Sequence, residues 1–67
     1  MYCLRSSDRY YHPGGWGDID VAHRFDSLGE AMYGLGNPPE GTEVIRFRDG
    51  VGMVVMRLSG EFWKNAS

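Results

Sequence analysis

The clearest alternation of apolar and polar positions lies in the last third of the chain, over residues 43–48 and 51–58. Both runs contain many β-branched residues, and Asp49-Gly50 between them is typical of a two-residue type I′ turn. The pattern therefore predicts a β-hairpin. A further turn after it would let residues 61–64 add a short last strand.

The turn also predicts the register of this hairpin, with Ile45 opposite Val54 and Val44 opposite Val55. Because side chains alternate across a sheet, the two faces of the hairpin differ in composition. The face that we expect to form the core under a helix carries Ile45, Phe47, Val54, Met56 and Leu58. The opposite face carries Val44, Arg46, Arg48, Val51, Met53, Val55 and Arg57.

A short amphipathic helix is predicted before the hairpin. Ser27 and Glu30 form a capping box, in which the hydroxyl accepts a backbone N–H and the carboxylate reaches back, although Asp26 can also cap. Helical spacing then gives one apolar stripe, formed by Leu28, Ala31, Met32 and Leu35. Gly36 and Asn37 end the helix, and the two prolines after them prevent it from continuing.

Two short runs near the N-terminus, residues 2–5 and 9–12, predict a second hairpin around a turn at residues 7–8. A two-residue turn there places Arg5 opposite Tyr10, which suits a cation–π contact. The chain is therefore expected to contribute two antiparallel hairpins to its sheet.

The segment between this hairpin and the helix has two parts. Residues 12–17 combine three glycines and a proline with Trp16, a composition that predicts a loop. Trp16 either covers the core or is presented to a partner. Residues 18–25 alternate at strand period, and we expect an extended segment that leads into the helix.

Together these elements predict an α+β fold formed by one domain over residues 1–67. We expect a small antiparallel sheet of four to five strands with one short helix packed on one face. The element order is β-β-α-β-β, with the extra C-terminal strand as the fifth. Cys3 is the only cysteine, so no intrachain disulfide can form, and a lone thiol favours the cytoplasm.

The sequence contains few residues of the types that catalysis or metal binding requires. Cys3, His12 and His23 do not have the spacing of metal ligands. On the predicted N-terminal hairpin, Cys3 and His12 would be a nucleophilic pair or a half-buried thiol beside a surface imidazole. Asp18 and Asp20 share a face of an extended segment, as paired carboxylates or as a solvated loop edge. We therefore expect no enzymatic activity, no metal and no cofactor.

Surface recognition is the chemistry that the sequence supports best. Arginine and methionine are enriched at the centres of protein interfaces, and the second face of the C-terminal hairpin carries both. Alternatively, the N-terminal strands cover this face and the arginine stems pack over its apolar residues. The candidate partner-binding residues are Arg46, Arg48, Arg57, Met53 and Val51 on this face, Tyr10 and Trp16 before it, and Asp18 and Asp20 as an acidic surface.

Residues 22–31, which read A-x-R-F-x-S-x-x-E-A, resemble the start of a helix in small phage and prophage accessory proteins. The order of helix, turn and antiparallel strands ending in Phe62-Trp63-Lys64 is similar to small anti-CRISPR proteins that act on type I surveillance complexes. The resemblance covers residues 22–64 and assigns no functional residue. It implies stoichiometric binding, in the cytoplasm of a host cell, that occludes the surface where target DNA or a recruited nuclease docks.

We therefore expect a non-enzymatic inhibitor of phage type that binds a host protein assembly such as a CRISPR effector complex. One alternative is a small nucleic-acid-binding module, in which three hairpin arginines contact phosphates and Tyr10, Tyr11 and Trp16 stack on bases. The net charge of −2 argues against direct nucleic-acid binding. The other alternative is a structural module that associates with its own copies. The longest apolar run, residues 53–56, is too short to cross a membrane, so no membrane partner is expected.

Overall fold

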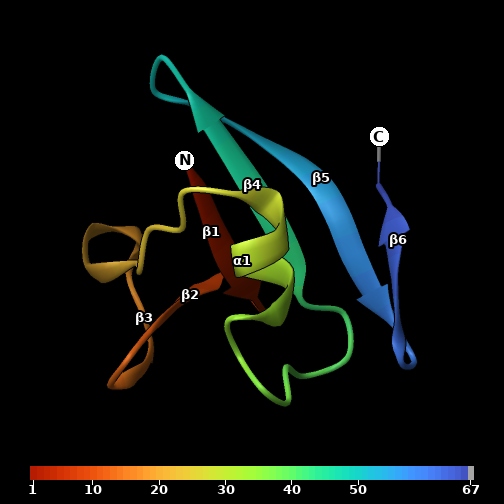
Figure 1. The fold of residues 1–67 in the computed structure, drawn as a ribbon. Helices are drawn as coiled ribbons and strands as arrows, with labels where there is room; N and C mark the ends of the chain where they lie inside the picture. The colour runs from red at the N-terminus through yellow and green to blue at the C-terminus, as the bar shows by residue number, and fades with distance from the viewer. Residues whose placement is uncertain (67) are drawn as a thin grey trace.

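The computed structural model describes residues 1–66 of the chain. These residues form an α+β fold with one antiparallel sheet of six strands, a 3₁₀ turn and one short helix (Figure 1). The strands are β1 (Tyr2–Ser6), β2 (Arg9–His12), β3 (Gly15–Gly17), β4 (Glu43–Arg48), β5 (Val51–Ser59) and β6 (Phe62–Asn65), the 3₁₀ turn is η1 (Ile19–Val21) and the helix is α1 (Leu28–Tyr33). Their order across the sheet is β3-β2-β1-β4-β5-β6.

The fold class is as predicted, but the sheet has six strands rather than four or five. The additional strand is β3, where Trp16 lies opposite Tyr11 and Gly15 opposite His12. Two of its three residues are glycines, which carry almost no strand propensity, so the sequence pattern indicated a loop. The extra C-terminal strand is present as β6, and the complete order is therefore three strands, η1, α1 and three strands.

The N-terminal hairpin pairs over only two residues of each strand. Arg5 lies opposite Tyr10, as predicted, around a turn whose two residues have positive φ angles of 51° and 64°. Beyond that point the backbone around Phe25 pairs with β1, through bonds of 2.9 and 2.8 Å between Tyr2 and Phe25. The pairs between β1 and β2 do not extend to Cys3 and His12, so these expected neighbours are not formed, and the partner of Cys3 is Ile45 of β4.

The β4–β5 hairpin contains a β-bulge that the sequence pattern does not reveal. Ile45 lies opposite Val54, as predicted, but Val44 lies opposite Met56 rather than opposite Val55. Val55 is therefore an extra residue on β5, and the residues beyond it change face relative to a regular ladder. The predicted core face is wrong for this reason. Ile45, Phe47 and Val54 share one face, whereas Val44, Met56 and Leu58 share the other.

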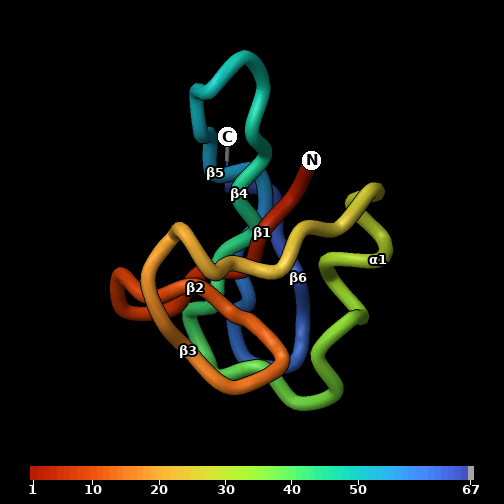
Figure 2. Tube along the Cα trace, turned by 90° about the vertical axis from the view of Figure 1, so that its left-hand side faces the viewer, coloured from red at the N-terminus to blue at the C-terminus, as the bar shows by residue number. Residues whose placement is uncertain are grey.

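The helix covers the face that carries Val44, which is the opposite of the prediction. The bulge brings two further apolar side chains to this side, so it is the more hydrophobic one. The buried cluster on this side consists of Leu4, Phe25, Ala31 and Val44. Half-buried residues pack around it, among them Tyr2, Tyr11, Leu28, Met32, Leu35, Met56 and Trp63. Leu58 is buried as well, and Ile45 and Cys3, which lie opposite each other on the other face, are also buried, so Ile45 is a core residue as predicted. In Figure 2, α1 and η1 lie on opposite sides of β1, because the chain crosses the sheet between them.

The helix begins as predicted and ends earlier. The Ser27 hydroxyl caps it by accepting the N–H of Glu30 at 3.1 Å. The last helical residue is Tyr33, and Gly34 follows as the C-cap. A side chain at Gly34 would overlap the ring of Phe25 and lie 2.6 Å from the carbonyl oxygen of Glu30. The helix therefore passes close to the buried phenylalanine at this point, and glycine is the residue that fits.

Residues 18–25, expected to be extended, divide into two conformations. Ile19–Val21 form η1, whereas Phe25 is extended and pairs with β1. The N–H of Val21 bonds to the Asp18 carbonyl at 3.1 Å, a local bond that the alternating pattern does not predict. Asp18 and Asp20 therefore do not lie on a strand.

Candidate functional site

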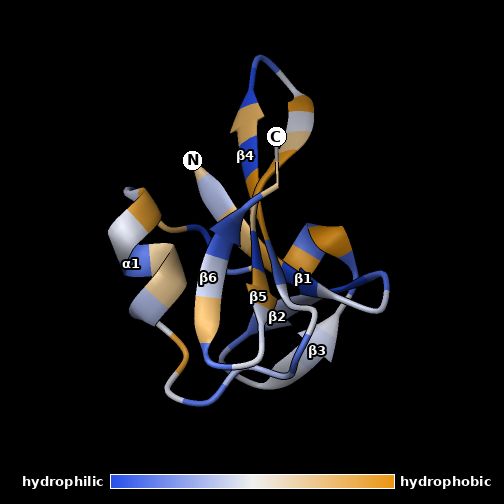
Figure 3. Cartoon of the chain, turned by 90° about the vertical axis from the view of Figure 1, so that its right-hand side faces the viewer, coloured by the Kyte–Doolittle hydropathy of each residue, from blue (hydrophilic) through white to orange (hydrophobic). Residues whose placement is uncertain are grey.

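Four of the predicted partner-binding residues lie together at the end of the β4–β5 hairpin. Arg46 lies opposite Met53 and Arg48 opposite Val51, so all four side chains share one face, which we call the hairpin-tip surface. The type I′ turn beyond it, with φ angles of 54° and 79°, holds the two strands in this register. Hydrophilic and apolar bands alternate along β4 here, whereas the facing part of β5 shows only apolar and pale bands (Figure 3).

The hairpin-tip surface is open to solvent. Val51 is 66% exposed and Met53 is 52% exposed, although both are apolar. The N-terminus lies beside it, because the N–H of Phe47 donates to the carbonyl oxygen of Met1 at 2.8 Å. Two exposed apolar side chains flanked by two guanidinium groups form a surface suited to another macromolecule rather than to solvent.

Arg57 is not part of this surface, which corrects the predicted line of three arginines. The bulge at Val55 turns Arg57 to the face that points away from α1, where it lies opposite Glu43. A regular ladder would have kept all three arginines on one face. For the same reason, Arg46, Arg48 and Arg57 do not form the single arginine surface that the nucleic-acid-binding alternative assumes.

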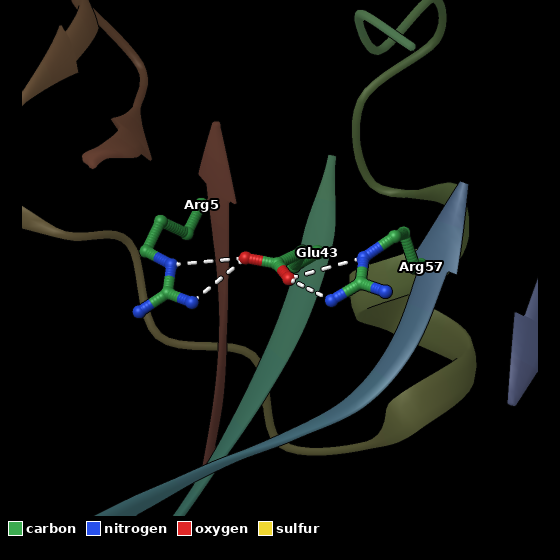
Figure 4. Close-up of polar contacts among 3 residues, drawn as sticks. All are labelled: Arg5, Glu43 and Arg57. Carbon is green, nitrogen blue, oxygen red and sulfur yellow. Dashed lines mark hydrogen bonds and ion pairs between the residues drawn. The ribbon is translucent and has the colours of Figure 1, made fainter. Parts of the chain in front are cut away.

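On the face opposite the helix, Glu43 joins two arginines from neighbouring strands (Figure 4). Its Oε1 accepts hydrogen bonds from Arg5, the shorter at 2.7 Å, and its Oε2 accepts bonds from Arg57, the shorter at 2.6 Å. The Glu43 side chain is 17% exposed, against 55% for Arg57. The three residues form the only ion-pair network among residues 1–66.

The protonation of this network follows from its hydrogen bonds. The bonds from Arg57, and then those from Arg5, hold the pKa of Glu43 below its usual range, because they favour the charged carboxylate. The hydrogen bond to Glu43 likewise raises the pKa of Arg5. Glu43 is therefore ionised at neutral pH with both oxygens occupied, which suits electrostatic positioning and not proton transfer.

The network extends into a longer line of side chains that crosses five strands. Tyr10 of β2 lies opposite Arg5, and Lys64 of β6 lies opposite Arg57. We call the five residues Tyr10, Arg5, Glu43, Arg57 and Lys64 the cross-strand row. Tyr10, a predicted binding residue, thus lies in this row and not at the hairpin-tip surface.

The sequence interpretation did not single out Arg5 or Lys64 as functional candidates, and it did not place Glu43 between two arginines. They come together only because β1 inserts beside β4, a long-range pairing that no local pattern indicates. The distribution of charged residues between strands and loops does indicate a positively charged sheet. The strands hold six of the seven basic residues and one of the nine acidic residues.

The remaining predicted binding residues lie elsewhere. Trp16 contacts Tyr11 edge to face, with ring centroids 5.9 Å apart, and Tyr11 in turn stacks on Phe25. This arrangement favours the interpretation of Trp16 as a cover of the core. Asp18 precedes η1 and Asp20 lies within it, and both are exposed.

Residues 1–66 contain no cluster of three or more His, Cys, Asp or Glu side chains able to hold a metal ion. Cys3 is buried, and desolvation raises the pKa of its thiol, the reverse of what a thiolate nucleophile requires. Within the same part of the chain, no helix has the length and apolar character needed to cross a membrane.

The chain was compared with protein-family models, with curated proteins and with solved structures. None of the three comparisons gives a match.

Proposed function

We propose that the chain is a non-catalytic binding module that docks on another protein through its hairpin-tip surface. The observation that supports this proposal is the pairing of Arg46 with Met53 and Arg48 with Val51 on one exposed face. Complete burial of a side chain such as Val51 or Met53 is worth about 1.5–3 kcal/mol each. Such a gain is available only when a partner covers them.

The same surface indicates the chemistry of the partner. Arginine pairs well with carboxylates because its planar guanidinium donates two parallel hydrogen bonds. A complementary partner therefore presents an apolar depression with acidic groups at its rim. The narrow, projecting shape of a two-stranded hairpin suits insertion into such a depression.

A specific class of partner follows from the resemblance of residues 22–64 to anti-CRISPR proteins. We propose that the chain acts in the cytoplasm of a host cell as a phage-type inhibitor. The first candidate partner is a type I CRISPR surveillance complex, in which the chain would block target DNA binding or nuclease recruitment. The hairpin-tip surface supplies residues for this role that the resemblance alone does not assign.

Affinity capture from a bacterial host lysate, in which such a complex is expressed, tests this proposal. The native sequence should retain a partner in stoichiometric amount, and Met53→Ser should release it because the apolar contact is lost. Val21→Ser is the matched control, since Val21 is 54% exposed and lies on η1, far along the chain from the hairpin. Retention of the same partner by Met53→Ser, or its equal loss with Val21→Ser, would contradict docking through the hairpin tip.

A further inference from the structure

The cross-strand row lies on the face of the sheet that points away from α1, and docking of the hairpin tip leaves it free. Each of its members lies directly opposite the next, from Tyr10 on β2 to Lys64 on β6. It is therefore a second surface, with its own chemistry.

Two guanidinium groups in this row share one carboxylate. Glu43 binds Nε and one terminal nitrogen of both Arg5 and Arg57, and the third nitrogen of each guanidinium points away from it (Figure 4). Lys64 adds an exposed ammonium next to Arg57. The row thus has a surplus of positive charge, and its two guanidinium groups are already held in fixed orientations.

The spacing of the cations follows from the sheet. Neighbouring strands lie about 4.8 Å apart, so Arg5 and Lys64 are separated by roughly 14 Å across three strand spacings. Glu43 occupies the position between the two arginines. A flexible polyanion that crosses the strands can therefore contact the cations in sequence along one line.

Aromatic side chains lie towards both ends of this line. Tyr10 stands beside Arg5 at one end. At the other end, Phe62 is two residues before Lys64 on β6, so alternation places it on the same face. Phe62 is 70% exposed. Tyr10 is half-buried. Accessible aromatic rings and cations side by side are the two elements with which proteins bind unpaired bases and phosphates.

The distribution of charge over the whole fold also favours a polyanion. Eight of the nine acidic residues lie in the helix, η1, turns and loops, whereas the strands carry a large excess of arginine and lysine. A net charge of −2 therefore conceals a positively charged sheet. Local fields of this kind steer ligands even when the total charge has the opposite sign.

We propose that this face binds single-stranded nucleic acid, with phosphates at Arg5, Arg57 and Lys64 and bases stacked on Tyr10 and Phe62. A segment made of acidic residues alone, such as polyglutamate, would satisfy the cations but has no rings that could stack on the two aromatic side chains. A duplex keeps its bases stacked inside and offers them no exposed face either. Single strands are the ligand that uses both components of the surface.

Fluorescence anisotropy with a labelled oligothymidylate of about 12 nucleotides tests the proposal, since such modules cover about 4–16 nucleotides. Each phosphate contact on a single strand contributes about 0.7 to the slope of log affinity against log salt. Three contacts predict a slope of about −2, so raising salt from about 50 to about 200 mM should weaken binding roughly 18-fold. Arg57→Gln should lower the magnitude of this slope by about 0.7, and Phe62→Ser should weaken binding with the slope unchanged.

The matched control is Arg48→Gln, which removes the same charge from the other face of the sheet. This variant should bind the oligonucleotide with an affinity within about twofold of the native sequence. Arg48 lies too far from the row to contact the bound strand, and salt screens its charge. Circular dichroism checks that each variant remains folded. Three results would each overturn the proposal: no binding at low salt, equal losses with Arg48→Gln and Arg57→Gln, or stronger binding of polyglutamate than of oligothymidylate. Loss of protein capture by Met53→Ser tests the proposed function separately, since it concerns the opposite face.

Discussion

Two neighbouring lines of residues cross the same three strands and have opposite environments. Leu4, Val44 and Met56 form one line on β1, β4 and β5, and Arg5, Glu43 and Arg57 form the next. The members differ by a single position on every strand. Leu4 and Val44 are fully buried under α1, whereas Arg57 is more than half exposed on the other face.

The comparison shows that one position along a strand decides between core and candidate binding surface. Both lines depend on the bulge at Val55, because it allows Met56 to join Val44 while Ile45 remains opposite Val54. A protein of 67 residues has little stability to spare, so the apolar line should control folding. The charged line should contribute far less to stability and more to recognition. Four changes test this division, from the largest expected effect to the smallest.

Insertion of one alanine between Val44 and Ile45 should abolish the fold. The added residue would pair with Val55, which has no partner on β4, and so restore a regular ladder. Glu43 and Arg57 would then turn towards the helix. The expected loss is the whole folding free energy, about 3–10 kcal/mol for a domain of this size. Deletion of Val55 is the control, since it keeps the observed pairs and should leave a cooperative urea transition. A folded insertion variant would show that the bulge does not set the faces.

Leu4→Ala should lower the free energy of unfolding by about 2–5 kcal/mol, because it leaves a cavity in the buried core. Arg5→Ala, one position along the same strand, should cost about 1 kcal/mol or less, because the side chain is partly exposed. Urea denaturation of both variants measures the difference directly. Equal costs would remove the distinction between the two lines.

Gly34→Ala should destabilise the protein by about 1–3 kcal/mol, because the new methyl group overlaps Phe25 and the backbone of Glu30. Gly29→Ala, within the helix, has nothing within 4 Å of the new methyl group. It should stabilise by about 0.4–1 kcal/mol, since alanine favours helix and restricts the unfolded chain. Thermal melts of the two variants should therefore shift in opposite directions, and a gain with Gly34→Ala would refute the close packing of α1.

Glu43→Gln should have a small effect on stability, about 1 kcal/mol or less at neutral pH, and less still at high salt. Its pH dependence is the sharper readout. Because the pKa of Glu43 is lowered in the folded protein, its contribution is present above the usual value of 4.5 and is lost as pH falls through the lowered pKa. Stability of the native sequence should therefore decline in this acidic window more than that of Glu43→Gln.

Local signals in the sequence predicted local features of the fold. The Ser27 cap, the turn at Asp49-Gly50 and the first pairs of both hairpins follow from short-range chemistry, and the structure confirms them. The hairpin-tip surface could be predicted for the same reason, because it lies next to the turn that sets its register. These features need no knowledge of the rest of the chain.

Long-range pairing accounts for what the sequence did not predict. A bulge depends on how a strand bends over the core, and a glycine-rich strand such as β3 depends on a free edge beside it. The cross-strand row requires β1 to lie between β2 and β4, and its five residues come from five different strands. Periodicity alone contains none of this information.

The position of Met1 has a practical consequence for measuring both surfaces. Its carbonyl is bonded to Phe47 at the base of the hairpin tip, so a fusion partner attached at the amino end would crowd the proposed protein contact. A fusion after β6, the last strand (Figure 1), would instead follow closely after Lys64, which belongs to the row. Fusion proteins that carry the added partner at opposite ends therefore each report on one surface, and disagreement between their results would itself locate the contact.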